Sequence, residues 1–317
     1  MQNINPNLVT VGIAVFNQEK YISQCIKSIL NQTYKEFVLI ISDNNSNDKT
    51  AAIINSYAIK DARIKFIQQS NNIGMLDNHR AILNYVDTKY FLWCQGDDWW
   101  DVNHLQRLIN LIQNNNNNPI AVSSGLINVN ENGIEYSRRF DRITSLEFNR
   151  NERIIACSLR ITLDWLYTSI FEFNALKESF DYVEKNIIKK NAGYLYILLY
   201  LESILIKIVE KGEYLYNNEF TLFKRNHSNS SDKRNNKLSI TYRTLLFSII
   251  EYYRLRPKIE NLKFHIIFLY LSFYRTVNIS NTYSTGRIQK YTSKFLYKIM
   301  INLNKVFFKK IDHIFFS

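Results

Sequence analysis

The fold of this chain is decided by one stretch, YFLWCQGDDWW, which spans residues 90–100. Its first part, Tyr90 to Cys94, is an uninterrupted run of strand-forming residues and predicts a buried β-strand. Two carboxylates, Asp97 and Asp98, follow at the open end of that strand. Adjacent carboxylates in such a place repel each other unless a cation binds beside them. The stretch therefore predicts a central strand with a charged site at its carboxyl end.

The sequence before this stretch alternates between strand-like and helix-like segments. Runs rich in β-branched and aliphatic residues predict strands over residues 8–16, 37–42 and 64–68. Apolar residues at helical spacing predict helices over residues 21–30, 50–59 and 77–86. This alternating order predicts an α/β fold, with a mostly parallel, Rossmann-type sheet and helices on both faces.

Polar residues follow each of the four expected strands. They are Asn17 and Glu19, residues 43–48, residues 71–74 and residues 96–98. In parallel α/β sheets, ligands bind beyond the carboxyl ends of the strands, and these ends meet at one edge. The sequence therefore predicts a ligand site at this edge rather than a purely structural sheet.

Both acidic stretches allow a ligand interpretation and a structural one. Mg²⁺ binds one or two carboxylates together with phosphate oxygens, so Asp97 and Asp98 favour a divalent cation that carries a diphosphate. The alternative is a solvated pair that caps a helix starting near Val102. Asp43 can accept a hydrogen bond from a base or a ribose, whereas Asp48 is expected to cap the next helix.

The net charge of the chain is concentrated in its last segment. Residues 1–120 carry 10 basic and 10 acidic side chains, and residues 121–232 carry 14 and 15. Residues 233–317 carry 16 and 3, a net charge of +13. We expect these three segments to be a ligand-binding half-domain, a second half-domain and a basic helical tail.

The basic residues of the tail are interleaved with Phe, Tyr, Ile and Leu. This pattern is typical of amphipathic helices that lie on an anionic membrane surface. The other interpretation is a helical cap with solvated lysines. A nucleic-acid-binding protein is the rival class for a basic, aromatic tail. The neutral first segment and the helical spacing argue against it, so we expect no nucleic-acid partner.

Three features bear on the compartment. Cys25, Cys94 and Cys157 are far apart in the sequence and odd in number, which favours a reducing environment. The N-terminal stretch has no basic segment followed by an apolar run, so no signal peptide is expected. The apolar residues 194–209 are interrupted by charges and predict a core helix rather than a membrane span. We therefore expect a cytoplasmic protein.

Four motifs of this chain resemble those of the family-2 glycosyltransferases, which have a GT-A fold. They are VTVGIAVFNQEKYISQCIKSILNQTY (residues 9–34), LIISDNNSNDKT (39–50), NNIGMLDNHRAI (71–82) and YFLWCQGDDWW (90–100). A weaker match, RNHSNSS (225–231), is similar to a loop of bacterial surface-polysaccharide members. The resemblance implies an inverting enzyme that moves a sugar from a nucleotide diphosphate donor to a hydroxyl of a glycan or lipid-linked acceptor. A location on the inner face of the cell membrane follows from such an acceptor.

The resemblance also implies roles for individual residues. The donor-binding residues that it implies are Phe16, Asn17, Glu19, Asp43, Asn45, Asn72, Gly74, Asn78, Gln95, Gly96 and Arg225. The implied ligands of a divalent cation, Mn²⁺ or Mg²⁺, are Asp97, Asp98 and His227, the last of which lies in the separate motif at residues 225–231. A lone histidine in a loop is otherwise simply solvated. The first segment would then be the nucleotide-sugar half of the domain, and the second segment the acceptor half.

The chain departs from the family pattern at two places. Gln95 stands where many members carry the first Asp of a D-x-D motif, and an amide adds no charge for a metal. Residues 191–194 correspond to the start of the helix that carries the family's proton acceptor, yet they contain no carboxylate. Asp181 and Glu184 lie just upstream and are the candidates for this base. The alternative is a sugar-nucleotide-binding homologue without turnover.

Overall fold

The structure, a computed structural model, describes residues 9–115, 118–139, 165–187 and 203–227. The chain divides into two compact units, and all of these residues belong to the unit that comprises residues 1–150 and 160–227. The basic tail, residues 233–317, and most of the expected helix 194–209 lie outside the described residues. The division of the chain into three segments therefore stays a prediction.

The first half of the described unit is a parallel α/β arrangement. Its elements are β1 (Val9–Val15), α1 (Ile22–Leu30), β2 (Phe37–Asp43), α2 (Thr50–Ala58), β3 (Ile64–Gln68), α3 (Met75–Leu83) and β4 (Tyr90–Gln95). The strands pair in the order β3-β2-β1-β4, and every pair is parallel. This confirms the expected fold class and the four strands that define it.

The second half extends the same sheet with mixed pairing. Its elements are β5 (Trp99–Trp100), α4 (His104–Gln113), β6 (Ala121–Val129), β7 (Glu135–Arg139), α6 (Trp165–Thr168), β8 (Ser169–Glu172), α7 (Phe173–Ile187) and β9 (Tyr214–Arg225). β8 lies antiparallel between β4 and β6, while β6 and β9 are parallel. β5, directly after the acidic turn, pairs antiparallel with β9. The expectation of a mostly parallel sheet therefore holds for β1 to β4, and β5, β7 and β8 are antiparallel.

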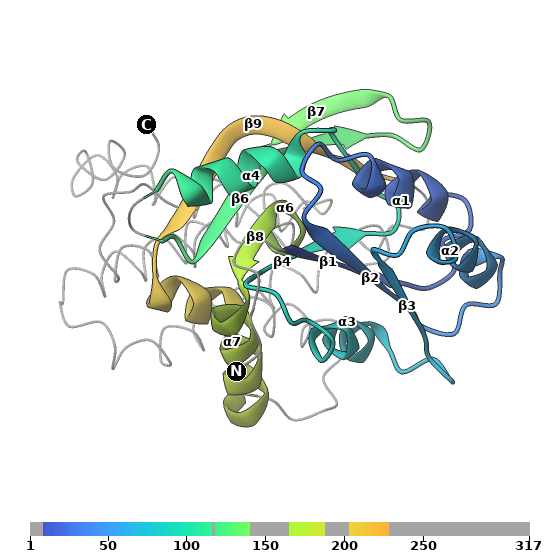
Figure 1. Ribbon diagram of the computed structural model, residues 1–317, viewed down its shortest axis with the longest axis horizontal. Coiled ribbons are helices and arrows are strands. Elements are labelled where there is room, and N and C mark those ends of the chain that lie inside the picture. The colour runs from blue at the N-terminus through green and yellow to red at the C-terminus, as the bar shows by residue number, and fades with distance from the viewer. Residues whose placement is uncertain (1–8, 116–117, 140–164, 188–202, 228–317) are drawn as a thin grey trace, which may run out of the picture. The chain divides into compact units, whose positions relative to one another are not determined.

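Helices cover both faces of the sheet, with α1, α2 and α4 on one side and α3 and α7 on the other (Figure 1). Successive residues of a strand face opposite sides of the sheet, so every second side chain of β1 points to the side of α1, α2 and α4. They pack against one stripe of α1, which consists of Ile22, Cys25, Ile26 and Ile29. Burial of each such side chain contributes about 1.5–3 kcal/mol. This packing holds the carboxyl ends of the parallel strands in register.

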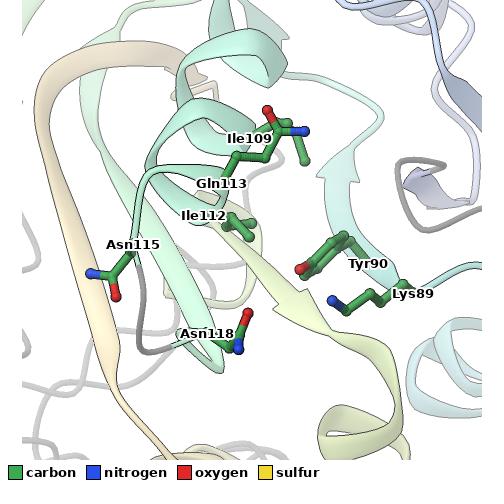
Figure 2. A pocket seen from close by; sticks show the side chains of 7 residues that line it. All are labelled: Lys89, Tyr90, Ile109, Ile112, Gln113, Asn115 and Asn118. Carbon is green, nitrogen blue, oxygen red and sulfur yellow. The ribbon is translucent and has the colours of Figure 1, made fainter.

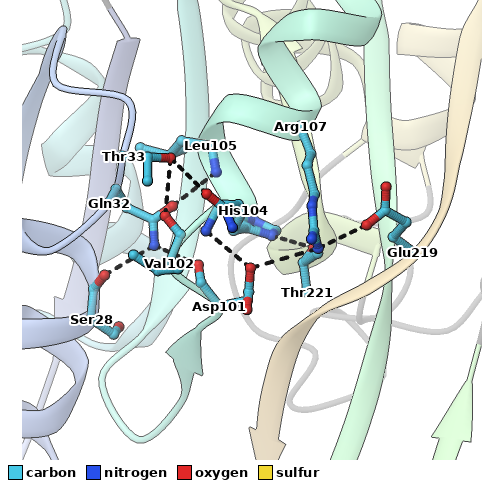
Figure 3. Close-up of polar contacts among 11 residues, drawn as sticks. Ser28, Gln32, Thr33, Asp101, Val102, His104, Leu105, Arg107, Glu219 and Thr221 are labelled. Carbon is cyan, nitrogen blue, oxygen red and sulfur yellow. Dashed lines mark hydrogen bonds and ion pairs between the residues drawn. The ribbon is translucent and has the colours of Figure 1, made fainter.

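A buried polar network fixes the chain that follows the acidic turn (Figure 3). The side-chain nitrogen of Gln32 donates to the carbonyl oxygens of Ser28 and Asp101, at 3.0 and 2.7 Å. Its side-chain oxygen accepts from the amide of Leu105 at 2.9 Å. Gln32 therefore satisfies backbone groups of α1 and of α4 at once, which ties the two helices together.

The same network reaches β9 (Figure 3). The imidazole Nδ1 of His104 lies 2.7 Å from the hydroxyl of Thr221. Arg107 forms an ion pair with Glu219 at 2.8 Å, and the amide of Asp101 donates to the carbonyl oxygen of Thr221 at 2.9 Å. These contacts set the position of β9, whose last residues enter the site described below.

None of the helices in the described ranges is both long enough and apolar enough to cross a membrane.

Candidate functional site

The loops after β1 and β2 are joined through Asp43, which is fully buried. The carboxylate of Asp43 accepts from the hydroxyl of Ser46 and from its amide, the latter at 3.1 Å. The Ser46 hydroxyl oxygen accepts in turn from the amide of Asn17 at 2.9 Å. Asn17 and Asn45 have φ angles of 54° and 61°, a left-handed conformation that asparagine tolerates well. Phe16 is 40% exposed beside this loop. The structure thus places four of the predicted donor-binding residues in these two loops.

Glu19 and Asp48 form a second link between the same two loops. The amide of Glu19 donates to Asp48 Oδ2 at 3.1 Å, and the amide of Lys49 donates to Glu19 Oε2 at 3.0 Å. Asp48 Oδ1 accepts from the amide of Thr50, the first residue of α2, at 2.9 Å. Asp48 therefore satisfies the first amide of α2, although the N-cap position itself is occupied by Lys49.

The loop after β3 is held by asparagine side chains. Asn44 Nδ2 donates to Asn72 Oδ1 at 3.0 Å, and the same oxygen accepts from the amide of Gly74 at 2.9 Å. Gly74 has a φ of 88°, a conformation that side-chain-bearing residues rarely adopt. The glycine thereby allows the sharp entry into α3 at Met75.

Asn78 is buried under this loop and joins α3 to β2. Its Oδ1 accepts from the hydroxyl of Ser42 at 2.6 Å, and its Nδ2 donates to the carbonyl oxygen of Ser42 at 3.0 Å. Both ends of the amide are thus engaged with the protein. The expected part of Asn78 in the wall of a ligand site stays a prediction, and its observed contacts position α3.

The acidic turn after β4 lies close to β1. A Cβ atom on Gly96 would lie 2.7 Å from a methyl group of Val15, so this position has no room for a side chain. Asp98 is 2% exposed, and its Oδ1 accepts from the amide of Arg225 at 2.8 Å. Burial, and then the charge of Asp97, raise the pKa of Asp98 well above its ordinary value. A cation bound beside the turn would oppose both effects.

Arg225 holds the turn from the opposite strand, β9. Its guanidinium lies between two aromatic rings, those of Tyr21 and Trp99, at 4.8 and 4.6 Å from their centroids. Nε donates to the carbonyl oxygen of Asp97 at 3.1 Å. The other two nitrogens donate to the carbonyl oxygen of Glu131 at 2.6 Å and to Gln24 Oε1 at 2.5 Å. Each guanidinium nitrogen thus has a protein partner, and Arg225 clamps the acidic turn between β6, β9 and α1.

His227 completes the turn two residues later. Its Nε2 lies 2.9 Å from Asp97 Oδ2, and its ring packs 5.1 Å from that of Tyr21. Both side chains of the pair are largely buried, at 7% and 14% exposed. An imidazole and a carboxylate that are 130 residues apart in the sequence therefore meet at the predicted metal position. In the part of the chain that the structure describes, no three acidic, histidine or cysteine side chains form a cation cluster.

The two candidates for the base lie on α7. Asp181 is exposed, and Glu184 forms an ion pair with Arg80 of α3. The stretch 191–194, where the family pattern predicts a carboxylate, lies outside the described residues. The assignment of a proton acceptor to Asp181 or Glu184 therefore stays a prediction.

Sequence reasoning missed two residues of this region, which are His79 and Tyr167. The hydroxyl of Tyr167 lies 3.1 Å from His79 Nε2. Burial raises the pKa of Tyr167 and lowers that of His79. The sequence held one signal that could have identified His79, because it directly follows Asn78 in the third motif.

A separate pocket opens at the amino end of β4 (Figure 2). The residues that line it are Lys89, Tyr90, Ile109, Ile112, Gln113, Asn115 and Asn118. The polar loops lie beyond the carboxyl end of β4, about 17–20 Å away for a strand of this length. This pocket therefore does not belong to the site at the loops.

The parallel strands β1 to β4, with the acidic turn at their carboxyl edge, have the arrangement of a GT-A fold. The sequence model described as Glycosyl transferase family 2 matches residues 10–180, which is more than half of the chain. The chain belongs to this family.

The relatives and a solved structure agree with this assignment. An uncharacterised glycosyltransferase of Methanocaldococcus jannaschii is 34% identical over 128 residues, which cover 40% of this chain and 44% of that protein. A UDP-Glc:α-D-GlcNAc-diphosphoundecaprenol β-1,3-glucosyltransferase of Escherichia coli is 26% identical over 186 residues, 58% of this chain and 71% of that protein. The fold is similar to that of Staphylococcus aureus TarS residues 1–349 in complex with UDP-GlcNAc, with a TM-score of 0.63 at 18% identity, covering 93% of this chain and 80% of that one. The chain thus spans less than half of the Methanocaldococcus relative.

Proposed function

We propose that this protein transfers a sugar, with inversion, from a nucleotide diphosphate donor to a hydroxyl of a glycan or lipid-linked saccharide. The observation that carries the proposal is the Asp97–His227 pair at the end of β4, 2.9 Å apart and adjacent to the buried Asp98. The names of two similar proteins support a uridine diphosphate donor, because that of the E. coli relative contains UDP-Glc and TarS is described in complex with UDP-GlcNAc. The diphosphoundecaprenol in the first of these names supports a lipid-linked acceptor and a role in surface-polysaccharide synthesis.

The donor would lie across the carboxyl edge of the first four strands. The loops that carry Asn17 and Ser46 offer carbonyl and amide groups for a base and a ribose, and the buried carboxylate of Asp43 holds them in place through Ser46. The turn at Gln95 and Gly96 would lie beside the diphosphate, and Gly96 lets it pack closely on Val15 of β1. Arg225 would support the diphosphate indirectly, through the turn that it clamps, as well as by its positive charge.

The residues present fit a divalent cation. Asp97 and His227 supply one oxygen and one nitrogen atom within 2.9 Å of each other. Asp98 adds a carboxyl group whose charged form is disfavoured by burial and by Asp97, and a cation would stabilise that form. Mg²⁺ and Mn²⁺ use few protein ligands when phosphate oxygens complete their shell. When bound, such a cation stabilises the charge that develops on a departing diphosphate. Asp97 and His227 are therefore the proposed direct ligands, and Asp98, which is bonded to the amide of Arg225, would add negative charge beside them.

The acceptor side of the proposal rests on α7. A carboxylate must take the proton of the acceptor hydroxyl as the new bond forms at the anomeric carbon. Asp181 and Glu184 remain the proposed bases, and Glu184 would first have to leave its ion pair with Arg80. If neither residue serves, the alternative is a protein that binds nucleotide sugars without turnover.

We further propose that the protein works in the cytoplasm, on the inner face of the cell membrane, and binds no nucleic acid. The support is the net charge of +13 on residues 233–317, since each basic residue near an anionic surface contributes about 1 kcal/mol. We expect sedimentation with vesicles of anionic lipid and release by salt. Equal binding to neutral and anionic vesicles, or none to either, would favour a helical cap instead.

The proposed donor and cation are tested together by calorimetry. Wild-type protein is titrated with UDP in Mn²⁺ and again in chelator, alongside Asp97→Ala. We expect the substitution to weaken UDP binding roughly tenfold or more, because a charge-assisted contact contributes about 1.5–3 kcal/mol. The control is Asp87→Ala, which removes an exposed carboxylate near the amino end of β4. Unchanged UDP affinity in both the chelator and the Asp97 variant would sink the proposal for the metal, and transfer assays over a panel of UDP-sugars would then test the enzyme itself.

A further inference from the structure

The side chain of Tyr21 lies where three segments that are far apart in the sequence meet. Tyr21 is the residue before α1, and its ring centroid lies 5.1 Å from that of His227, which follows β9. The Tyr21 hydroxyl donates to Glu131 Oε1, in the turn between β6 and β7, at 2.9 Å. One aromatic side chain therefore contacts both the β6–β7 turn and one of the two proposed direct ligands of the cation.

The backbone of Tyr21 is fixed by the first turn of α1. Its amide donates to the carbonyl oxygen of Gln18 at 3.0 Å, and its own carbonyl oxygen accepts from the amides of Gln24 and Cys25 at 3.0 and 3.2 Å. Cys25 is fully buried in the core. The Tyr21 side chain thus projects from a backbone that the core holds in place, so its ring can support a neighbouring side chain.

Mutual contacts among three residues hold the ring itself. The guanidinium of Arg225 lies 4.8 Å from the centroid of the Tyr21 ring and donates to the carbonyl oxygen of Glu131 at 2.6 Å. The carboxylate of Glu131 accepts in turn from the Tyr21 hydroxyl. Each of the three residues therefore contacts the other two, and the ring cannot leave its place without breaking one of these contacts.

The imidazole of His227 packs on this support. Its Nε2 lies 2.9 Å from Asp97 Oδ2, and the planes of the Tyr21 and His227 rings meet at 36°. An imidazole binds a metal through a nitrogen lone pair in the plane of its ring, so metal binding requires that plane to have one direction. Residues that orient a metal-binding histidine affect the affinity for the metal even though they do not touch it.

We propose that Tyr21 is a positioning residue for the divalent cation, and that its ring holds the His227 imidazole in the orientation in which Nε2 and Asp97 bind the same ion. The inference rests on the proposed function, because the cation is the one that we assign to Asp97 and His227. The ring is the group that acts. The bond from the hydroxyl to Glu131 contributes less, because it is exposed and water can replace it.

NMR of the metal-free protein tests the contact first. The sequence contains five histidines, and His227→Gln identifies the imidazole signals of His227 by their loss. We expect the ring of Tyr21 to displace these signals from their ordinary positions. The displacement should persist in Tyr21→Phe, which keeps an aromatic ring, and disappear in Tyr21→Leu. The control is Tyr136→Leu, at a tyrosine of β7 that is 60% exposed, and it should leave the signals of His227 unchanged. Signals of His227 that are not displaced in wild type overturn the inference, whether or not the variants fold.

The second measurement compares two cations, each titrated into the protein in the presence of excess UDP. Imidazole is a better ligand for Co²⁺ than for Mg²⁺, which prefers oxygen. We expect Tyr21→Leu to bind Co²⁺ about 10–100-fold more weakly than wild type, the usual effect of losing a residue that orients a metal ligand. Its affinity for Mg²⁺ should fall by about threefold or less, because the imidazole contributes little to that ion. Tyr21→Phe should stay within about threefold of wild type for both cations, because it keeps the ring.

The outcomes separate this inference from the proposed function. Equal losses for Co²⁺ and Mg²⁺ in Tyr21→Leu would show a general loosening of the site and overturn the role of His227. Equal losses in Tyr21→Phe and Tyr21→Leu would assign the effect to the hydroxyl and overturn the role of the ring. If wild type binds UDP and Co²⁺ and Tyr21→Leu binds them equally well, this inference alone is wrong. Wild-type protein that binds neither probe overturns the proposed function, on which the inference rests.

Discussion

The loops after β1 and β2, where we propose that the nucleoside binds, and the acidic turn lie on the same sheet edge, yet they are held by different kinds of contact. The loops after β1 and β2 are tied by amides and hydroxyls of nearby residues, for example Ser46 to Asp43 and to Asn17. The acidic turn is held by Arg225 and His227, which are more than 120 residues away in the sequence. The first region is built largely from its own motifs, whereas the second depends on the whole sheet being assembled.

This difference predicts where the molecule is most sensitive. A loop built from local hydrogen bonds loses one bond when one partner is removed, at a cost of about 1 kcal/mol. The buried guanidinium of Arg225 donates to three groups, so its removal leaves several polar groups unsatisfied at once. Substitutions on the β9 side should therefore cost more stability than equivalent ones in the loops, although both line the same site.

The largest effect is expected at Arg225. In Arg225→Leu the carbonyl oxygens of Asp97 and Glu131 and the side-chain oxygen of Gln24 lose their donor. Because each buried acceptor left unsatisfied costs about 1–3 kcal/mol, we expect a loss of about 3–5 kcal/mol in the free energy of unfolding. Urea unfolding measures it. The matched control is Arg138→Leu, whose ion pair with Glu135 is exposed and should cost less than about 1 kcal/mol. Equal losses in the two variants would contradict the clamp.

His104, which contacts Thr221 of β9, tests the long-range contacts through the pH dependence of stability. Burial lowers the pKa of this imidazole from 6.5 to about 3, and its Nε2 has no hydrogen-bond partner among the described residues. Between these pH values the unfolded chain binds the proton and the folded protein does not. The contribution of a neutral His104 is therefore fully present above pH 6.5 and is lost as the pH falls below it.

We expect His104→Gln to remove part of this acid sensitivity. From pH 7 to pH 5, wild type should lose about 2 kcal/mol more than the variant in the free energy of unfolding. Urea unfolding at several pH values gives the difference between the two proteins, which cancels the carboxylates that they share. Parallel pH profiles would show that His104 becomes protonated in the folded state as easily as in the unfolded chain.

The same contrast explains what the sequence could predict. The strands that became β1 to β4 match their expected ranges within one or two residues, because each is a β-branched or aromatic run between turn residues. The polar residues after them were assigned to one edge because parallel strands all end on the same side. α3 begins two residues earlier than expected, since the positive φ of Gly74 sets its start.

The second half was harder to predict for physical reasons. β8 has four residues, too few for a periodic pattern, and its antiparallel place between β4 and β6 depends on partners more than 40 residues away. α7 was missed although Phe173, Leu176, Phe180 and Val183 follow helical spacing. The contacts of Arg225 with Tyr21 and Trp99 require the full strand order, and no local signal carries that order.

The smallest effect is expected in the loops, at Ser46. Its hydroxyl donates to Asp43 and accepts from the amide of Asn17, so Ser46→Ala removes one side chain with two bonds. We expect a loss of about 1–2 kcal/mol in the free energy of unfolding, and UDP affinity about threefold to tenfold lower because the nucleoside loop loosens. The control, Ser56→Ala, removes an exposed hydroxyl that bonds only within α2 and should be close to neutral. If Ser46→Ala destabilised the protein as much as Arg225→Leu, the nucleoside loops would depend on long-range assembly as strongly as the acidic turn does. An unchanged UDP affinity together with the expected loss of stability would place the nucleoside away from this loop.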